Sequence, residues 1–166
     1  MGIFDLFKSK PAAPKIVPRN FFNIRVGDVI AYDEIDYMVK QVYEYNENGY
    51  KWMDYHLVDG EDDLWLGVDD DDGVELSVYK KVLWEDETFP KKVVYDGVTY
   101  YLEEHGTARV VNKSDYMDAK VVPVEYADYE DEEGEKYMSL ERWGNDFEAS
   151  VGYGIKPHHI KIFPKE

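Results

Sequence analysis

The sequence predicts an all-β protein, and three observations support this fold class. The chain has 166 residues, of which 15 are Tyr, 7 Phe and 4 Trp, and aromatic and β-branched side chains suit a pleated, half-buried surface better than a helix. Turn-forming pairs separate the apolar runs, as expected for hairpins: Asn48-Gly49, Asp59-Gly60, Asp72-Gly73 and Asp96-Gly97. No long segment has an apolar stripe with a 3.6-residue period, which argues against parallel βαβ units.

The first 20 residues differ from the rest and are predicted to form an amphipathic tail and linker. Ile3, Phe4, Leu6 and Phe7 cluster beside lysines and precede a proline-spaced stretch. A short N-terminal amphipathic helix could make peripheral contact with a membrane surface or a protein partner. A frayed tail is the alternative, because isolated helices this short are marginal in water.

Five strands are expected in the first half of the remaining chain. They cover Val29 to Tyr32, Asp36 to Tyr45, Tyr50 to Val58, Leu64 to Val68 and Val74 to Leu83. Simple alternation along the second strand places Tyr37, Val39, Gln41, Tyr43 and Tyr45 on one face.

The strand pattern recurs, which predicts two tandem, similar antiparallel β units. The hairpin that begins at Tyr32 resembles the one at Tyr95, 63 positions later, and Asp54-Tyr55 corresponds to Asp128-Tyr129 at an offset of 74. The predicted units are residues 21–84 and 91–166, joined at Trp84 to Pro90, with extra length in the second around Asn112 to Ala119. Together they are expected to form one globular domain, packed as a sandwich or as a pair of small barrels.

Composition narrows the classes of function. The formal net charge of −17 disfavours binding to nucleic acid. The absence of cysteine excludes disulfides and thiolate sites. No leader-like segment or apolar run of membrane-spanning length is present, so a cytoplasmic location is expected. Known nucleophile, phosphate-binding and zinc motifs are also missing, which predicts a non-enzyme without cofactor or metal.

Aromatic and acidic residues at related places in the two units form the candidate ligand site. They are Trp52, Asp54, Tyr55, Trp65, Tyr126, Asp128, Tyr129, Glu141 and Trp143. Carboxylates and aromatic faces bind ammonium groups, so a polyamine or a lysine-rich peptide is the ligand chemistry they favour. Two alternatives stay open: these aromatics simply form the core, or Asp128 and Glu141 act as acid and base in an enzyme.

The chain also resembles a bacterial family catalogued as domain of unknown function 4178, over roughly Phe21 to Pro164. In the first half the resemblance lies in Val26-Gly27-Asp28-Val29, Tyr32, Tyr37, Gly49-Tyr50-Lys51-Trp52, Tyr55-His56-Leu57 and Trp65-Leu66-Gly67-Val68. In the second half it lies in Tyr100, Glu103, Gly106-Thr107-Ala108, Asp128-Tyr129, Leu140-Glu141-Arg142-Trp143-Gly144, Glu148, Ser150 and Gly152.

The resemblance implies a genetic context rather than a reaction. It implies that members look like companions of phage-shock-protein-A-type membrane-remodelling proteins and of polyamine aminopropyltransferases in bacterial gene clusters. Together with the missing enzyme motifs and the internal repeat, this context predicts a non-catalytic binding or adaptor protein, accessory to an envelope-stress or membrane-remodelling complex, with a protein partner still to be identified. Binding of small cations such as polyamines is the second expectation.

Overall fold

The structure is a computed structural model, and it describes residues 17–114 and 120–166. Eleven strands and one 3₁₀ turn, Pro157–His159, make up the regular structure of these residues. The strands are β1 (Val29–Tyr32), β2 (Ile35–Glu47), β3 (Tyr50–Asp59), β4 (Asp62–Asp70), β5 (Val74–Val82), β6 (Lys92–Tyr95), β7 (Val98–Asn112), β8 (Val121–Asp131), β9 (Lys136–Trp143), β10 (Asp146–Ile155) and β11 (Lys161–Phe163).

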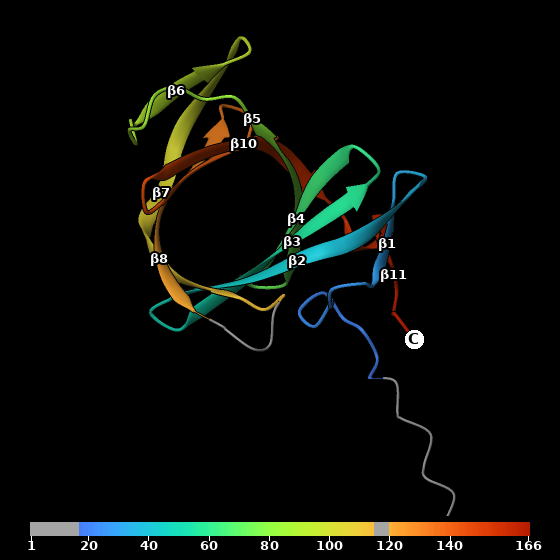
Figure 1. Cartoon of the computed structure of the whole chain (residues 1–166). Coiled ribbons are helices and arrows are strands. Elements are labelled where there is room, and N and C mark those ends of the chain that lie inside the picture. Colours follow the sequence, from blue (N-terminus) through green and yellow to red (C-terminus); the bar gives the residue numbers. More distant parts are fainter. Residues whose placement is uncertain (1–16, 115–119) are drawn as a thin grey trace, which may run out of the picture.

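Eight of the strands close into a ring, which Figure 1 shows in a view along its axis. Successive strands pair antiparallel from β2 to β5 and from β7 to β10. Two further antiparallel pairings, β5 with β10 and β2 with β7, join the two runs and leave no free edge within the ring. The fold is thus a single closed antiparallel barrel, and both predicted units contribute strands to it.

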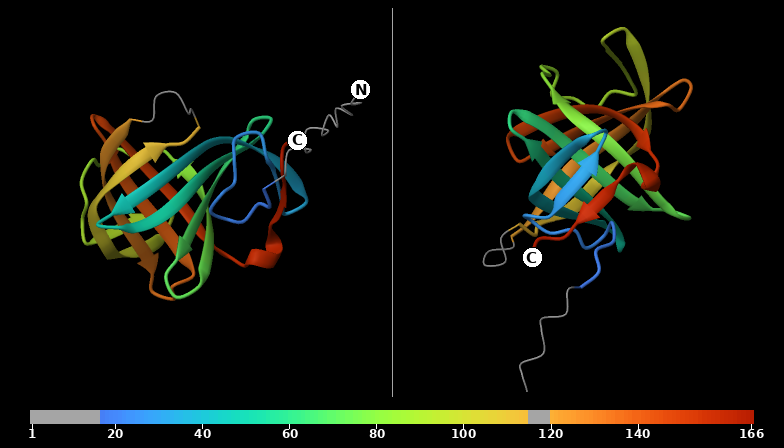
Figure 2. Two further views of the ribbon diagram at one scale, coloured as in Figure 1. Left: turned by 90° about the horizontal axis from the view of Figure 1, so that it is seen from below. Right: turned by 90° about the vertical axis from the view of Figure 1, so that its right-hand side faces the viewer.

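The long strands β2 and β7 each leave the ring at one end. The first part of β2 pairs with β1, and residues Tyr43–Asn46 pair with β7. The first part of β7 pairs with β6 in the same way. The short strands β1, β6 and β11 therefore lie outside the ring (Figures 1 and 2).

A β-bulge at Lys40 makes the single-face prediction for the second strand wrong. Register with β3 shifts between Val39 and Gln41, so the side chains beyond the bulge change face. Tyr37 and Val39 are buried in an outer core together with Val42, whereas Gln41 and its alternate neighbours point into the ring. An equivalent shift occurs in β7 between Leu102 and Glu104.

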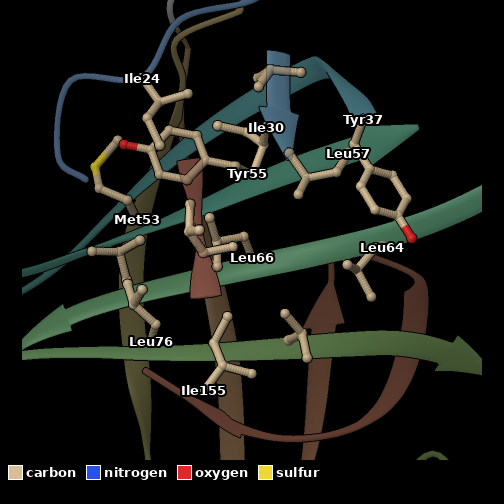
Figure 3. Packing of buried hydrophobic residues seen from close by; sticks show 14 of the residues in the cluster. Ile24, Ile30, Tyr37, Met53, Tyr55, Leu57, Leu64, Leu66, Leu76 and Ile155 are labelled. Carbon is tan, nitrogen blue, oxygen red and sulfur yellow. The ribbon is translucent and has the colours of Figure 1, made fainter. Parts of the chain in front are cut away.

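The two largest hydrophobic cores lie on the outer side of the ring wall. The first brings together Ile30 of β1, Leu57 of β3, Leu66 of β4 and Leu76 of β5 in one cluster (Figure 3). The second packs Val93 of β6 and the segment before it against β8, β9 and β10. These two cores thus lie outside the ring, while a smaller cluster with Ala108, Val110 and Val124 packs beside Tyr45 and Tyr126 of its inner face.

The strand and turn predictions are confirmed, and the packing prediction needs correction. All four predicted turn pairs fall at strand ends, and Asn48-Gly49 and Asp96-Gly97 both adopt positive φ as two-residue hairpin turns require. Neither a sandwich nor a pair of barrels forms, because β5–β10 and β2–β7 pairing merges the two halves into one ring. The predicted N-terminal helix lies outside the described residues.

Along residues 17–114 and 120–166, no helix is long and apolar enough to cross a membrane.

Candidate functional site: a cavity inside the ring

The interior of the ring contains a cavity of about 350 Å³. All eight ring strands contribute to its wall, because every second residue of each strand points inward. The lining residues are Gln41, Tyr43, Tyr45, Tyr50, Trp52, Asp54, Trp65, Gly67, Val68, Asp69, Ser77, Tyr79, Lys81, Glu104, Tyr126, Asp128, Ser139, Glu141, Trp143, Asp146, Glu148 and Ser150.

Along each ring strand, side chains that line the cavity alternate with side chains that point to the outer cores. On β5, Ser77, Tyr79 and Lys81 line the cavity while Leu76 and Val78 lie in the outer core. The other strands of the wall alternate similarly. Polar residues that would normally mark a solvated face of a sheet here mark its enclosed face.

The aromatic residues of the wall form one connected group. Tyr45 stacks on Trp52 with ring centroids 5.1 Å apart and an interplanar angle of 15°. The Tyr126 ring contacts Trp52 in an edge-to-face arrangement, with ring centroids 5.5 Å apart. Tyr43 lies 5.7 Å from Trp65 and 5.6 Å from Trp143. These contacts fix each ring from the sides, which presents rigid aromatic surfaces to the cavity.

Carboxyl groups are the second component of the wall. Seven acidic residues line the cavity, namely Asp54, Asp69, Glu104, Asp128, Glu141, Asp146 and Glu148, against one basic lining residue, Lys81. With these groups ionised, the cavity carries a large negative charge in surroundings of low polarisability. Charge of one sign with low-dielectric walls concentrates counter-ions of the other sign.

Three of these acids are only partly exposed in the cavity wall, and their pKa values are raised. Burial raises the pKa of Asp128 to about 7, with a smaller contribution from the Glu141 carboxylate. Burial, followed by repulsion from Glu141 and Asp128, raises the pKa of Asp54 well above its usual range. The pKa of Glu141 is raised as well, again mainly by burial. These carboxyls therefore keep their protons to higher pH than ordinary carboxyls do, and a cation bound beside them would displace those protons.

Glu141 is held in place by two donors. The Tyr45 hydroxyl donates to its carboxylate at 3.1 and 3.3 Å, and the Trp143 indole N–H donates at 2.8 Å. At another part of the wall, the Tyr126 hydroxyl contacts both Glu47 and Glu104, the latter at 3.1 Å. Aromatic and acidic side chains are thus positioned by each other.

Seven of the nine residues named from the sequence line this cavity: Trp52, Asp54, Trp65, Tyr126, Asp128, Glu141 and Trp143. Tyr55 and Tyr129 do not. They are one residue out of phase with the inward face and are buried in the two outer cores. Their hydroxyls donate to the carbonyls of Phe21 and Pro90, each at 2.7 Å, so both act as anchors for the segment that covers their core.

Sequence reasoning missed 15 of the 22 residues that line the cavity. The clearest omissions are Tyr43 and Tyr45, hidden by the bulge, and the inward series of β5 and β10, which includes Lys81 and Glu148. A usable signal existed: polar residues at alternate positions, each flanked by apolar ones. It was not decisive because a solvent-facing sheet gives the same pattern.

In the described ranges no group of three or more His, Asp or Glu side chains is arranged to hold a metal ion. Predicted contacts of Ile3, Phe4, Leu6 and Phe7 lie outside the described residues.

Comparison with known proteins identifies relatives of unknown function. Residues 25–157 match the family described as "Domain of unknown function (DUF4178)". Uncharacterized proteins of Mycobacterium tuberculosis (strain H37Rv) and Mycobacterium bovis are 25% identical to the chain over 160 residues, covering 92% of it and 76% of each relative. No solved structure matches the chain.

Proposed function

The chain belongs to the DUF4178 family, and because that family has no assigned activity we propose its function from the cavity: it binds a small organic cation of the polyamine class inside the ring. The observation that carries the proposal is the wall itself, which combines seven acidic residues with aromatic rings that contact one another. Ammonium groups are bound by both kinds of group, through charge-assisted hydrogen bonds and cation–π contact. The volume of about 350 Å³ suits a small ligand.

We further propose that the two halves of the ring are copies of one unit. The same order of elements in both halves supports this, as do the bulges at corresponding places in β2 and β7. Each half also supplies one aspartate of the cavity wall, Asp54 on β3 and Asp128 on β8. Two such carboxyls in one cavity favour a ligand with two or more ammonium groups.

Isothermal titration with spermidine at low salt tests the function. We expect saturable binding that weakens with added salt, since the attraction is electrostatic. The Asp54→Asn and Asp128→Asn variants should each bind at least about tenfold more weakly, because each loses a charge-assisted hydrogen bond in an enclosed site.

The matched control is Asp71→Asn, which removes one negative charge at the exposed β4–β5 turn. This variant should bind spermidine as the unaltered chain does. Absence of saturable heat from the unaltered chain, or equal losses in all three variants, would reject the proposal.

A non-catalytic role is part of the proposal, and it separates binding from the carboxylate-enzyme alternative. Asp128 and Glu141 line the same cavity, so the fold brings together the two carboxyls that this alternative needs. Spermidine recovered chemically unchanged after long incubation with the protein supports binding. A new product detected by mass spectrometry would contradict a purely binding role.

The adaptor role in an envelope-stress complex stays a prediction, as do the cytoplasmic location and the protein partner. Their support is the family context and the N-terminal tail at residues 1–20. Co-purification with and without residues 1–18 tests them. Failure to recover any envelope-stress protein with the full chain would contradict them.

A further inference from the structure

The one basic residue among those lining the cavity, Lys81, occupies a defined position in its wall. It lies on β5, directly opposite Ser150 of β10 and diagonal to Glu148. Its ammonium group is 2.9 Å from a Glu148 carboxylate oxygen and 5.0 Å from the centre of the Trp65 ring. The side chain is 47% exposed, so this position marks an opening of the cavity to solvent.

The Trp65 ring beside the Lys81 ammonium is held by other side chains. His56 stacks on Trp65 with centroids 4.6 Å apart and an interplanar angle of 8°, and Tyr43 contacts the same indole. Glu148 pairs across β9 and β10 with Glu141, which places a second carboxyl next to it. The Trp65 face thus stays in position without Lys81, and the register of β9 with β10 keeps Glu148 at the cavity opening beside Glu141.

We propose that Glu148 and the Trp65 ring form an ammonium subsite at the cavity opening, which the Lys81 side chain fills and for which it competes with cationic ligands. A tethered ammonium group of this kind occupies the subsite when no ligand is present. Competition with a ligand rests on the proposed function, whereas the subsite itself does not. The ligand group that enters it is a primary ammonium, like the group it replaces.

The Lys81→Ala variant empties the subsite, and n-propylammonium replaces the atoms removed. NMR of the four tryptophan indole N–H groups reports where the probe binds, with the Trp65 resonance identified from a Trp65→Phe variant. We expect n-propylammonium chloride to shift the Trp65 resonance saturably in Lys81→Ala, at least about tenfold more tightly than in the unaltered chain. Trp84, outside the cavity, should respond only as it does to sodium chloride.

Two variants make this test specific. Lys80→Ala removes the neighbouring lysine, whose ammonium lies 3.8 Å from Asp62 and which does not line this cavity. It should leave the weak response of the unaltered chain unchanged. Lys81→Ala combined with Glu148→Gln should lose the tight response. An equal response in Lys81→Ala and the unaltered chain, or its survival in the double variant, would overturn the proposal.

Binding of spermidine distinguishes the ammonium subsite from the proposed polyamine-binding function. Lys81→Ala should bind spermidine more tightly than the unaltered chain, because the competing charge is gone. If n-propylammonium binds as described and spermidine binds neither chain, the subsite stands and the proposed function fails. If spermidine binds and n-propylammonium gives no Trp65 shift, the cavity function stands and the subsite is rejected.

Discussion

Among single residues, Asp128 links the charge of the cavity to the stability of the fold. Its pKa is raised to about 7 in the folded chain by burial, whereas an aspartate in an unfolded chain titrates near 4. Between about pH 4 and pH 7 the folded state therefore binds more protons than the unfolded state, and the free energy of unfolding falls as pH rises. Above about pH 7 this contribution is constant.

Replacing Asp128 by Asn should flatten that pH dependence. We expect Asp128→Asn to be more stable than the unaltered chain at pH 8, with the difference vanishing toward pH 4, since Asn resembles the protonated acid. Urea unfolding from pH 4 to pH 8 in amine-free buffers measures the change. Some dependence of the unfolding free energy on pH should remain, because the pKa values of Asp54 and Glu141 are also raised. Asp71→Asn is the control, and parallel curves for the unaltered chain and Asp128→Asn would contradict the prediction.

The hydroxyls of Tyr55 and Tyr129 should each contribute to stability through one buried hydrogen bond. Removing either in a Tyr→Phe variant leaves the Phe21 or Pro90 carbonyl without its donor. The expected loss is about 1–2 kcal/mol in the free energy of unfolding, measured by urea denaturation. Tyr101→Phe, at a half-exposed ring, is the control and should change stability by less than about 0.5 kcal/mol. Equal losses at all three positions would argue against a specific role for these hydroxyls.

At the level of elements, the β5–β10 pairing depends on a glycine. A Cβ placed at Gly152 would lie 2.0 Å from the carbonyl oxygen of Val78, which is backbone of the partner strand. Gly152→Ala should therefore force the two strands apart and cost about 1–3 kcal/mol of unfolding free energy, measured in urea.

Gly154 on the same strand is the matched control. The nearest atom to a Cβ placed there would be the side-chain hydroxyl of Tyr137, at 3.2 Å. Gly154→Ala should lose clearly less stability than Gly152→Ala. The reverse order would show that close approach of β5 and β10 at Gly152 does not limit their pairing.

Strand and turn positions in this fold are local properties, and this is why the sequence predicted them. Asn48-Gly49 and Asp96-Gly97 specify two-residue hairpins through positive φ, independently of the rest of the chain. The bulge at Lys40 carries no comparable signal, because one extra residue in a long alternating strand changes the face of its side chains without changing composition. Tyr43 and Tyr45 were consequently assigned together with Tyr37 to one face.

Ring closure is a property of the whole molecule and was not predictable from local pattern. It depends on pairings between residues far apart in sequence, such as Val151 with Lys80 and Tyr45 with Val110. The candidate site was found in part because Asp54 and Asp128, with the aromatics beside them, recur at related positions. Tyr55 and Tyr129 do not belong to the site. Each follows a cavity-lining aspartate in its strand, and adjacent residues of a strand point to opposite faces.

The same long-range pairings predict that neither half of the chain folds alone. Separation between Asp86 and Glu87, in the exposed segment after β5, would leave β2, β5, β7 and β10 with unpaired edges. The first half would also lose β11, which pairs with β1, and Ile155 and Ile160 from its outer core.

We therefore expect residues 1–86 and 87–166, produced separately, to show no cooperative thermal unfolding by circular dichroism. Mixed in equal amounts, they should form a one-to-one complex that unfolds cooperatively, because edge pairing and the shared core are restored together. The complex should also regain spermidine binding if the cavity function holds, since the cavity wall needs strands from both halves. Cooperative unfolding of either half alone would contradict the dependence of the fold on ring closure and would favour two independent domains.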